Sequence, residues 1–507
     1  MPVRFRTTSL RFFALLAFLL GFSSANAQLK TPKEPLSPAL TIKPSDVDYQ
    51  LRESFLLVRK ANDGDPRAQH ELGLRYLTGR GFFPDTVKAI YWIEKAAAQG
   101  LPLANFNLGI LYTNGWGVPW NPFEAFKHFR LATRGPMPEP LFALGLIYTE
   151  NLAVPANMDS ARSLLTRAAA LGYEPAQSSL DEMRRRGVFS DSTKWATSKP
   201  PADSTHGPKP PPVFLDFAGD TLSRQSDPRQ IDQIISQRGV PLQRMLGMDI
   251  DSTSGIDTTA DALQMITFAA NIGSPEARTF LGRCYETGTG YPQDVLLAAV
   301  EYLSALRVDS PRAYELLWDL VQQVGFEESL TSRAKTHDAN AEYVTAGLIS
   351  VRITPQLDDQ QAVRLLESAV KQRHVESMLE LGVRYSSGRG VARDRAKAYA
   401  LWREAQHLGS GEARVRLAAA QILDQPTDPA SHDDFAYLTE ASTEGSVLAQ
   451  AAIGYCYETG IVVAKNSAQA ARYYRKAASR GSQGAYVSLR HMYDELRPDD
   501  PQFQIPE

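Results

Sequence analysis

The spacing of glycine and alanine constrains the fold of this chain more than any other feature. At six places a glycine is followed sixteen residues later by an alanine, and seven residues after that by a second alanine. The first three glycines lie 36 residues apart. The six glycines are Gly73, Gly109, Gly145, Gly282, Gly382 and Gly454. Such a fixed period is typical of a repeat protein, in which each repeat is one supersecondary element.

Each repeat reads as two short helices joined by a turn. In the first repeat Ala68, Leu72 and Tyr76 recur every four residues, which places them on one face of a helix, called helix A. A glycine inside a helix costs roughly 1 kcal/mol relative to alanine, so its return in each repeat indicates close approach by a neighbouring helix. Paired glycines such as Gly79 and Gly81 then end helix A, because glycine accepts left-handed backbone without strain.

A second apolar stripe follows the turn with the spacing i, i+3, i+4 and i+7, as in Ala89, Trp92, Ile93 and Ala96. We call this segment helix B. Two short amphipathic helices cannot bury their apolar faces alone, so neighbouring pairs must stack. The predicted fold class is therefore all-α, a right-handed α-solenoid of stacked helix-turn-helix repeats in two arrays.

The pattern resembles the Sel-1-like repeat family, which is similar to tetratricopeptide repeats. Repeats of that family follow A-x-x-x-L-G-x-x-Y-x-x-G-x-G-V and then a helix ending K-A-A-x-x-G, and AQHELGLRYLTGRG with KAIYWIEKAAAQG matches both parts. With weaker copies included, about nine repeats are visible over residues 66–187 and 262–484. The resemblance implies an adaptor that presents a concave helical surface to protein partners, often at membranes.

The N-terminus has the pattern of a secretory signal peptide. Arg4, Arg6 and Arg11 precede an apolar run over residues 12–22, and Ala25-Asn26-Ala27 supplies a small-residue cleavage site. A membrane anchor is the alternative, but this run of 11 residues is shorter than the roughly 20 that span a bilayer. We expect cleavage after residue 27 and a periplasmic or secreted product.

Composition indicates the remaining boundaries between segments of the chain. The stretch SKPPADSTHGPKPPP has the Pro, Ser and Thr density of an extended linker. The predicted segments are a signal peptide (1–27), a flexible N-terminal segment (28–50), an N-terminal repeat array (51–187), a Pro-rich linker (188–228), a C-terminal repeat array with a capping helix (229–496) and a polar tail (497–507).

Charge and cysteine content exclude several kinds of partner. Removing residues 1–27 takes away three arginines and no acid, which leaves 51 basic residues against 57 acidic ones and a net charge of −6. This balance indicates no nucleic-acid partner. Cys284 and Cys456 occupy the same position of their repeats, so we expect two free thiols that fill the core. No His or Cys cluster has zinc-ligand spacing, and we expect no cofactor or metal.

Three short motifs resemble functional sequences. Ser332-Arg333-Ala334-Lys335 matches the S-x-x-K of serine acyl-transfer enzymes, but neither S-D-N nor K-T-G occurs in the chain. Residues 249–255 resemble the start of a calcium loop, with the glycine at position 7 instead of 6. Arg184-Arg185-Arg186 ends a predicted helix, where cations favour the helix dipole, and contact with a phosphate or an acidic partner is the alternative.

The candidate binding residues are polar helix A positions that differ between repeats, together with two tryptophans on a predicted turn. An exposed tryptophan on a turn is a typical contact residue, although either one could instead pack onto the following helix. The predicted partner-binding residues are Gln69, His70, Glu71, Arg75, Asn105, Asn107, Trp116 and Trp120.

These observations favour an exported, non-catalytic scaffold that binds a protein or peptide through a concave helical surface. One alternative is a cell-envelope hydrolase with its site in residues 214–261, which the repeats do not explain. The other is a peptidoglycan or carbohydrate binder that stacks sugars on Trp116 or Trp120, which requires at least one of these side chains to be exposed.

Overall fold

The structure is a computed structural model of the 507-residue chain, and it describes residues 54–185, 246, 248, 259–353 and 358–505. The predicted signal peptide, the flexible N-terminal segment and the Pro-rich linker lie outside the described residues. So do residues 249–255 and most of residues 214–261. The predictions made for these segments therefore stay predictions.

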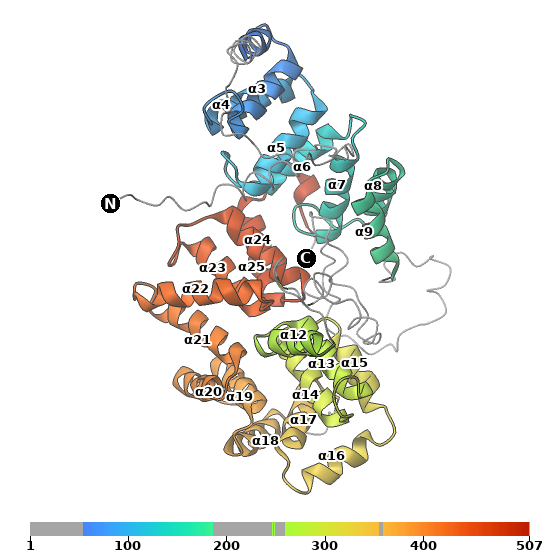
Figure 1. The fold of residues 1–507 in the computed structure, drawn as a ribbon, viewed down its shortest axis with the longest axis vertical. Coiled ribbons are helices and arrows are strands. Elements are labelled where there is room, and N and C mark those ends of the chain that lie inside the picture. The colour runs from blue at the N-terminus through green and yellow to red at the C-terminus, as the bar shows by residue number, and fades with distance from the viewer. Residues whose placement is uncertain (1–53, 186–245, 247, 249–258, 354–357, 506–507) are drawn as a thin grey trace, which may run out of the picture. The chain divides into compact units, whose positions relative to one another are not determined.

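Every regular element of the described residues is helical, and they contain no strand (Figure 1). Residues 54–62 are also helical. The α-helices are α3 (Pro66–Thr78), α4 (Thr86–Ala98), α5 (Pro102–Asn114), α6 (Pro122–Ala132), α7 (Pro138–Glu150), α8 (Met158–Ala170), α9 (Glu174–Arg185), α12 (Thr259–Asn271), α13 (Pro275–Thr287), α14 (Val295–Arg307), α15 (Ala313–Val321), α16 (Phe326–Ala334), α17 (Ala339–Ser350), α18 (Asp359–Lys371), α19 (Val375–Ser387), α20 (Arg395–His407), α21 (Gly411–Asp424), α22 (Ala430–Thr443), α23 (Val447–Thr459), α24 (Ser467–Ser479) and α25 (Gln483–Leu496), followed by the short 3-10 helix η3 (Pro501–Phe503). The predicted all-α repeat fold is confirmed.

Local sequence fixes where each helix begins and ends. At the start of α3, Asp65 Oδ1 accepts hydrogen bonds from the backbone N–H groups of Arg67 and Ala68 at 2.8 and 3.2 Å. These bonds satisfy N–H groups that have no partner within the helix. α3 ends at Gly79, whose φ of 73° is left-handed. The same left-handed glycine ends four other helices, at Gly115, Gly288, Gly388 and Gly460.

The glycine inside helix A lies against the residue twenty positions later on helix B. A Cβ atom placed on Gly282 would lie 2.5 Å from a ring carbon of Tyr302, and one on Gly454 would lie 2.6 Å from the ring of Tyr474. The pairs in contact are Gly73–Ile93, Gly109–Phe129, Gly145–Leu165, Gly282–Tyr302, Gly382–Trp402 and Gly454–Tyr474. The predicted close helix approach is confirmed, and it explains why glycine recurs.

The chain forms two compact units, a first unit up to Leu144 and a second unit from Gly145 onward. This boundary falls within α7. It is a different division from the two predicted arrays, whose linker is outside the described residues, so the predicted domain organisation is untested. In the first unit Ile93, Leu108 and Leu111 belong to one core between successive helical pairs. Small alanines between them allow the helices to approach closely.

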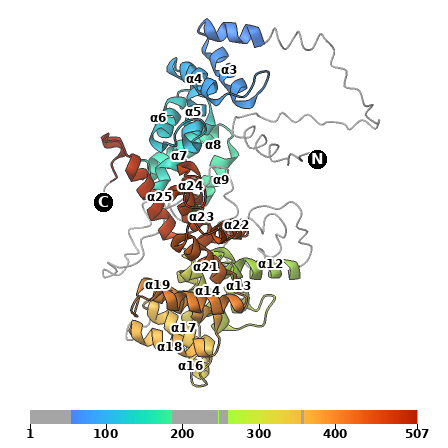
Figure 2. The ribbon, with the colours of Figure 1, turned by 90° about the vertical axis from the view of Figure 1, so that its left-hand side faces the viewer.

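The second unit curls until helices far apart in sequence touch. Asn271 at the end of α12 donates from Nδ2 to the carbonyl oxygen of Gly409 at 3.0 Å and accepts from the backbone N–H of Gly411 at 3.2 Å. Likewise, the N–H of Gln483 donates to Asp309 Oδ2 at 3.3 Å. Figure 2 shows α13 and α14 beside α21, and Arg307 at the end of α14 forms an ion pair with Glu412 on α21. The inner side of this array is therefore covered by its own helices.

Candidate functional site

Four of the eight predicted partner-binding residues lie inside the first unit. Gln69, His70, Asn105 and Asn107 are each at most 5% exposed. Gln69 Nε2 donates to the carbonyl oxygen of Ala61 at 3.0 Å. Buried polar side chains of this kind are retained because each finds a hydrogen-bond partner. Contact with a partner protein by these four residues stays a prediction, and what the structure shows is that they hold successive helices together.

Two histidines join this internal polar ladder. Asn107 Nδ2 donates to His70 Nε2 at 2.8 Å, and His128 Nδ1 lies 3.0 Å from Asn105 Oδ1. Burial lowers the pKa of His70 to about 4 and also lowers the pKa of His128. A neutral imidazole is required at His70, because only an unprotonated Nε2 can accept the hydrogen bond from Asn107.

The lowered pKa of His70 makes stability depend on pH in a defined direction. The pKa of His70 is near 6.5 in the unfolded chain and about 4 in the folded chain. The contribution of neutral His70 to folding stability is therefore complete above pH 6.5 and falls as pH drops from 6.5 to 4. The full loss is about 3 kcal/mol. We expect His70→Gln, which keeps an acceptor but does not titrate, to show a smaller loss of urea-unfolding stability between pH 7.5 and pH 4.5.

The control for this measurement is the wild type, unfolded in urea at the same pH values and the same salt concentration. Equal pH slopes for His70→Gln and the wild type would contradict the assignment of a neutral, buried His70.

The other four predicted residues are only partly accessible. Glu71 and Arg75 form an ion pair at 2.9 Å, with their side chains 43% and 11% exposed. Trp116 is half-buried against the core of the first unit, and Trp120 is 8% exposed. The burial of Trp120 supports the alternative interpretation, in which it packs the turn onto the following helix. Trp120 therefore does not supply the exposed aromatic ring that a sugar-binding site requires.

The burial of Gln69 and Asn105 follows from their place in the repeat. Both stand four residues before the helix A glycine, which we call the minus-four position. In the second unit Arg278, Tyr343, Met378 and Gln450 hold this position and are each at most 4% exposed, whereas Arg414, four residues before the alanine that replaces the helix A glycine at position 418, is exposed. Polar side chains at this position are thus buried in the stack in both units, although not in every repeat.

Arg278 belongs to an ionic cluster inside the second unit, made of Arg278, Glu301, Arg307, Glu376, Glu412 and Arg416. Arg307 binds Glu412 with two parallel hydrogen bonds of 2.9 and 3.0 Å and also contacts Glu376. Arg278 Nη1 lies 2.9 Å from Glu301 and 3.1 Å from Glu376. The three positive charges balance the three negative ones.

The arginines of this cluster keep two of its carboxylates, Glu376 and Glu412, ionised. Burial alone would raise the pKa of Glu376, but Arg278 and Arg307 lower it to about 2. Burial would also raise the pKa of Glu412, but Arg307 and Arg416 hold that pKa well below its usual range. At Glu301 burial outweighs Arg278 and raises the pKa. The cluster joins α13 and α14 to α19 and α21, so it closes the array on itself.

A second group of buried polar contacts acts beside the cluster. Arg480, at the end of α24, donates to both carboxylate oxygens of Glu276 on α13, at 2.5 and 3.0 Å from its two nearest nitrogens. It also donates to Gln450 at 3.2 Å and to the carbonyl oxygen of Leu246 at 3.4 Å. The sequence reasoning missed these contacts. One signal was present: Glu276, Glu376 and Glu412 each stand six residues before the helix A glycine or its alanine replacement, the minus-six position.

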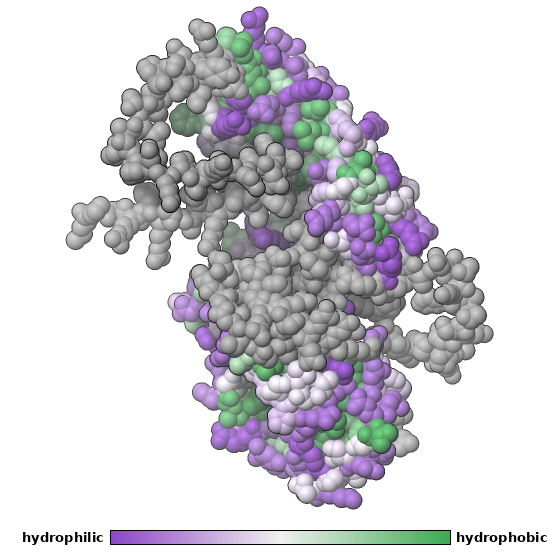
Figure 3. Space-filling view, turned by 45° about the vertical axis from the view of Figure 1, so that its right-hand side comes forward, coloured by the Kyte–Doolittle hydropathy of each residue, from purple (hydrophilic) through white to green (hydrophobic). Residues whose placement is uncertain are grey.

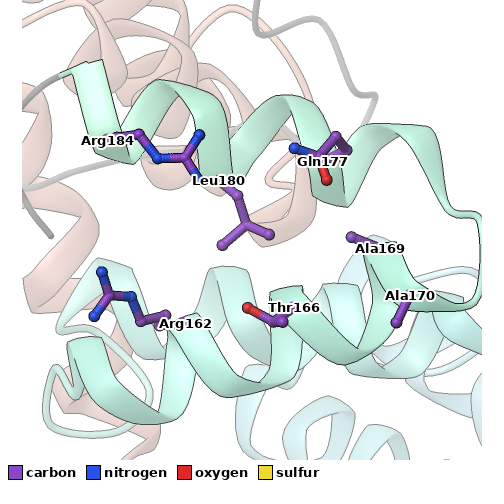
Figure 4. A pocket seen from close by; sticks show the side chains of 7 residues that line it. All are labelled: Arg162, Thr166, Ala169, Ala170, Gln177, Leu180 and Arg184. Atoms are coloured by element: carbon purple, nitrogen blue, oxygen red, sulfur yellow. The ribbon is translucent and has the colours of Figure 1, made fainter.

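A shallow groove lies between α8 and α9 of the second unit and encloses about 380 Å³ (Figure 4). The lining residues are Arg162, Thr166, Ala169, Ala170, Gln177, Leu180 and Arg184. Figure 4 shows both arginines at one end of the groove. However, Arg184 Nη1 lies 2.7 Å from Asp181 and the side chain of Arg184 is 72% exposed. The part of the basic run that is described is therefore paired with a carboxylate at the surface.

The described residues also bear on metals, membranes and thiols. In the described ranges no group of three or more His, Cys, Asp or Glu side chains is placed to hold a metal ion. None of the helices described is long and apolar enough to cross a bilayer. On the face shown in Figure 3, hydrophobic residues outside the grey atoms form small patches among hydrophilic ones.

Cys284 and Cys456 are buried free thiols, as predicted, and burial raises the pKa of Cys456 to about 11.

Stacked helical hairpins of this length define an α-solenoid repeat protein. Seven segments of the chain match the Sel1 repeat family, at residues 66–101, 102–135, 141–173, 275–305, 351–374, 375–410 and 447–482. The chain belongs to the Sel1 repeat family. Residues 313–339 and 413–445, which we count among the weaker copies, are not among the matched segments, although both form helical pairs.

The chain is similar to three proteins of bacterial origin. An uncharacterized protein of Neisseria meningitidis serogroup B is 27% identical over 275 residues, which are 47% of this chain and 58% of that protein. A solved Sel1 repeat protein from Oxalobacter formigenes is 34% identical, with 26% of this chain and 98% of that one covered and a TM-score of 0.25. A solved protective antigen of uropathogenic Escherichia coli with an SLR fold is 21% identical, with 88% and 84% covered and a TM-score of 0.29. The chain thus matches little more than half the length of its curated relative.

Proposed function

We propose that this protein is an exported, non-catalytic scaffold that binds protein partners through the helix A surface of its first unit. Sel1 repeat proteins typically mediate protein–protein interactions, and the seven matched segments support the same general role here. Export is part of the proposal and rests on the signal-peptide pattern of residues 1–27. Recovery of a chain from the periplasm or medium that begins near Gln28 would support it.

One observation carries the proposal: the minus-six position of helix A has different surroundings in the two units. In the second unit it holds Glu276, Glu376 and Glu412, which are bound to arginines inside the closed array, and Ala341 and Leu448. In the first unit it holds Arg67 and Leu103, which are both exposed, and the partly exposed Glu139. At Arg67 and Leu103, the surface that three glutamates fill in the second unit is therefore open.

The chemistry of this open surface fits a protein partner. Leu103 is 38% exposed, and the partly exposed Phe106 lies beside it on α5, held by a ring contact of 5.9 Å with Phe129. Arg67 and Glu71 on α3 supply one positive and one negative charge. Apolar contacts bordered by charges of both signs are typical of protein–protein interfaces, whereas a nucleic-acid site requires a basic surface.

The experiment compares capture by two surface variants of the mature chain. In the first, Arg67→Glu, Glu71→Arg and Leu103→Asp change the helix A surface, and we expect about tenfold or greater loss of the proteins captured from the source cell envelope. The reason is that these three side chains supply both charges and the exposed leucine of the helix A surface. Quantitative mass spectrometry after cross-linking measures the loss.

The matched control changes two charges and one apolar residue on the outer face of α4: Val87→Asp, Lys88→Glu and Glu94→Arg. Val87 is 77% exposed, so these changes leave the core intact. The control should capture the same proteins as the wild type. If the helix A variant retains them equally well, the proposed surface is wrong. No observation on the described residues favours the hydrolase or the peptidoglycan-binding alternative.

A further inference from the structure

The helical pair α15 and α16 interrupts the repeat pattern of the second unit. It lies between the matched segments 275–305 and 351–374, and each of its helices has nine residues, against thirteen in α13 and in α14. Figures 1 and 2 both show α16 at the outer edge of the second unit. Because binding residues often stand where a rigid scaffold departs from its regular pattern, this pair is a natural place for a separate surface.

α15 has one face in the core and the other in solvent. Leu316, Leu317 and Leu320 are at most 5% exposed and belong to the main core of the second unit. On the opposite face Tyr314 is 39% exposed and Trp318, four residues later, is 46% exposed. Since the leucines fix the rotation of the helix, the two aromatic side chains are held on its outer surface.

The turn between the two helices is also held in place. Gln323 Nε2 donates to Glu286 Oε1 at 2.7 Å, and Phe326 on the other side of the turn is 3% exposed. Gly325 adopts a left-handed φ of 92°, which allows the sharp change of direction. Between these anchors Val324 is fully exposed. Its exposure is therefore a fixed feature of the turn.

Within residues 313–328, which include these three apolar residues, every exposed charged side chain is acidic. Glu315 is exposed beside Tyr314 on α15, and Glu327 and Glu328 are exposed in the first turn of α16, three and four residues after Val324. Carboxylates at a helix N-terminus are favoured by the helix dipole. They also repel nucleic acids and anionic lipids and attract cations.

We propose that Tyr314, Trp318 and Val324, with Glu315, Glu327 and Glu328 around them, form a docking surface for a cationic segment of a protein partner. Arginine and lysine side chains bind to the faces of tryptophan and tyrosine rings, and the three carboxylates supply the matching charge. Tryptophan and tyrosine are also the residues that most often dominate binding energy at protein interfaces. This surface goes beyond the proposed function and uses none of the residues of the helix A surface of the first unit.

The test uses a fluorescein-labelled 15-residue peptide built from Arg, Leu and Gly, and the same peptide with Glu in place of Arg. We expect the mature full-length chain to bind the arginine peptide at least about tenfold more tightly than the glutamate peptide at about 150 mM salt, measured by fluorescence anisotropy. The double variant Tyr314→Ala/Trp318→Ala should weaken binding of the arginine peptide by about tenfold or more.

Two controls separate this surface from the general negative charge of the chain. Tyr455→Ala removes an aromatic residue of similar exposure, 38%, on α23 and should bind like the wild type. Glu327→Lys/Glu328→Lys should weaken binding, whereas Asp433→Lys/Glu440→Lys on α22 should weaken it less. The proposal is overturned if both peptides bind equally, if the aromatic double variant binds like the wild type, or if the two charge variants behave alike.

Discussion

Replacing Arg307 by methionine should destabilise the second unit by about 3–5 kcal/mol, the usual cost of breaking a buried ion pair by removing one partner. Arg307 is fully buried with Glu412, and the change would leave two carboxylates, Glu376 and Glu412, in an interior that is short of one cation. Equilibrium unfolding in urea, followed by circular dichroism, measures the loss. The matched control is Arg364→Met on α18, because Arg364 is exposed, and it should change stability by less than about 0.5 kcal/mol.

The pH dependence of this difference provides a second readout. In the wild type the pKa of Glu376 is lowered to about 2, so its contribution to stability is complete above the ordinary value of 4.5 and is lost as pH falls toward 2. Without Arg307, the pKa of Glu376 should lie closer to its ordinary value. The stability difference between wild type and Arg307→Met should therefore shrink as pH falls from 4.5 toward 2. A difference that is constant over this range, or a loss below about 1 kcal/mol at pH 7, would show that the cluster does not hold the array closed.

Gly282→Ala should destabilise the protein by about 1–3 kcal/mol, the typical cost of adding a methyl group to a filled core. Alanine is a better helix former by roughly 1 kcal/mol, so helix propensity alone would give the opposite sign. The added Cβ would lie 2.5 Å from the ring of Tyr302, which is fully buried. Tyr302 cannot move away easily, because its hydroxyl donates to Glu286 at 2.5 Å. Thermal or urea unfolding measures the effect.

The control is Gly484→Ala in α25, where an added Cβ would meet no atom within 4 Å. This change should stabilise the protein slightly, by up to about 1 kcal/mol, through helix propensity and reduced freedom of the unfolded chain. If both substitutions stabilise, then the glycine of helix A does not mark a close helix contact, and the explanation of the repeat pattern fails.

The sequence predicted the fold well because the signals of this fold are local. The capping helix expected at the end of the C-terminal array is α25 (Gln483–Leu496). Helix periodicity and left-handed glycines at helix ends act over a few residues, so one sequence suffices to find them.

The candidate site was harder to predict. Gln69 and Asn105 are polar and hold a position that differs between repeats. In the sequence alone, such a position looks the same as one that contacts a binding partner. Their burial depends on which face the next helix covers, and that is a property of the stack. Trp318 was not singled out in the sequence either, because its exposure follows from the burial of Leu316, Leu317 and Leu320 on the other face of α15.

By itself, the sequence determined that this protein is a stack of Sel1-type helical pairs, because the glycine and alanine spacing fixes each pair locally. Only the tertiary structure decided that the second unit closes on itself. Arg307 and Glu412, which join across that closure, are 105 residues apart. The curvature of a solenoid is the sum of small rotations between repeats, and shortened helices such as α15 and α16 change that sum. No single stretch of sequence contains the result, so the closed second unit and the open helix A surface of the first unit emerge only when the stack is assembled.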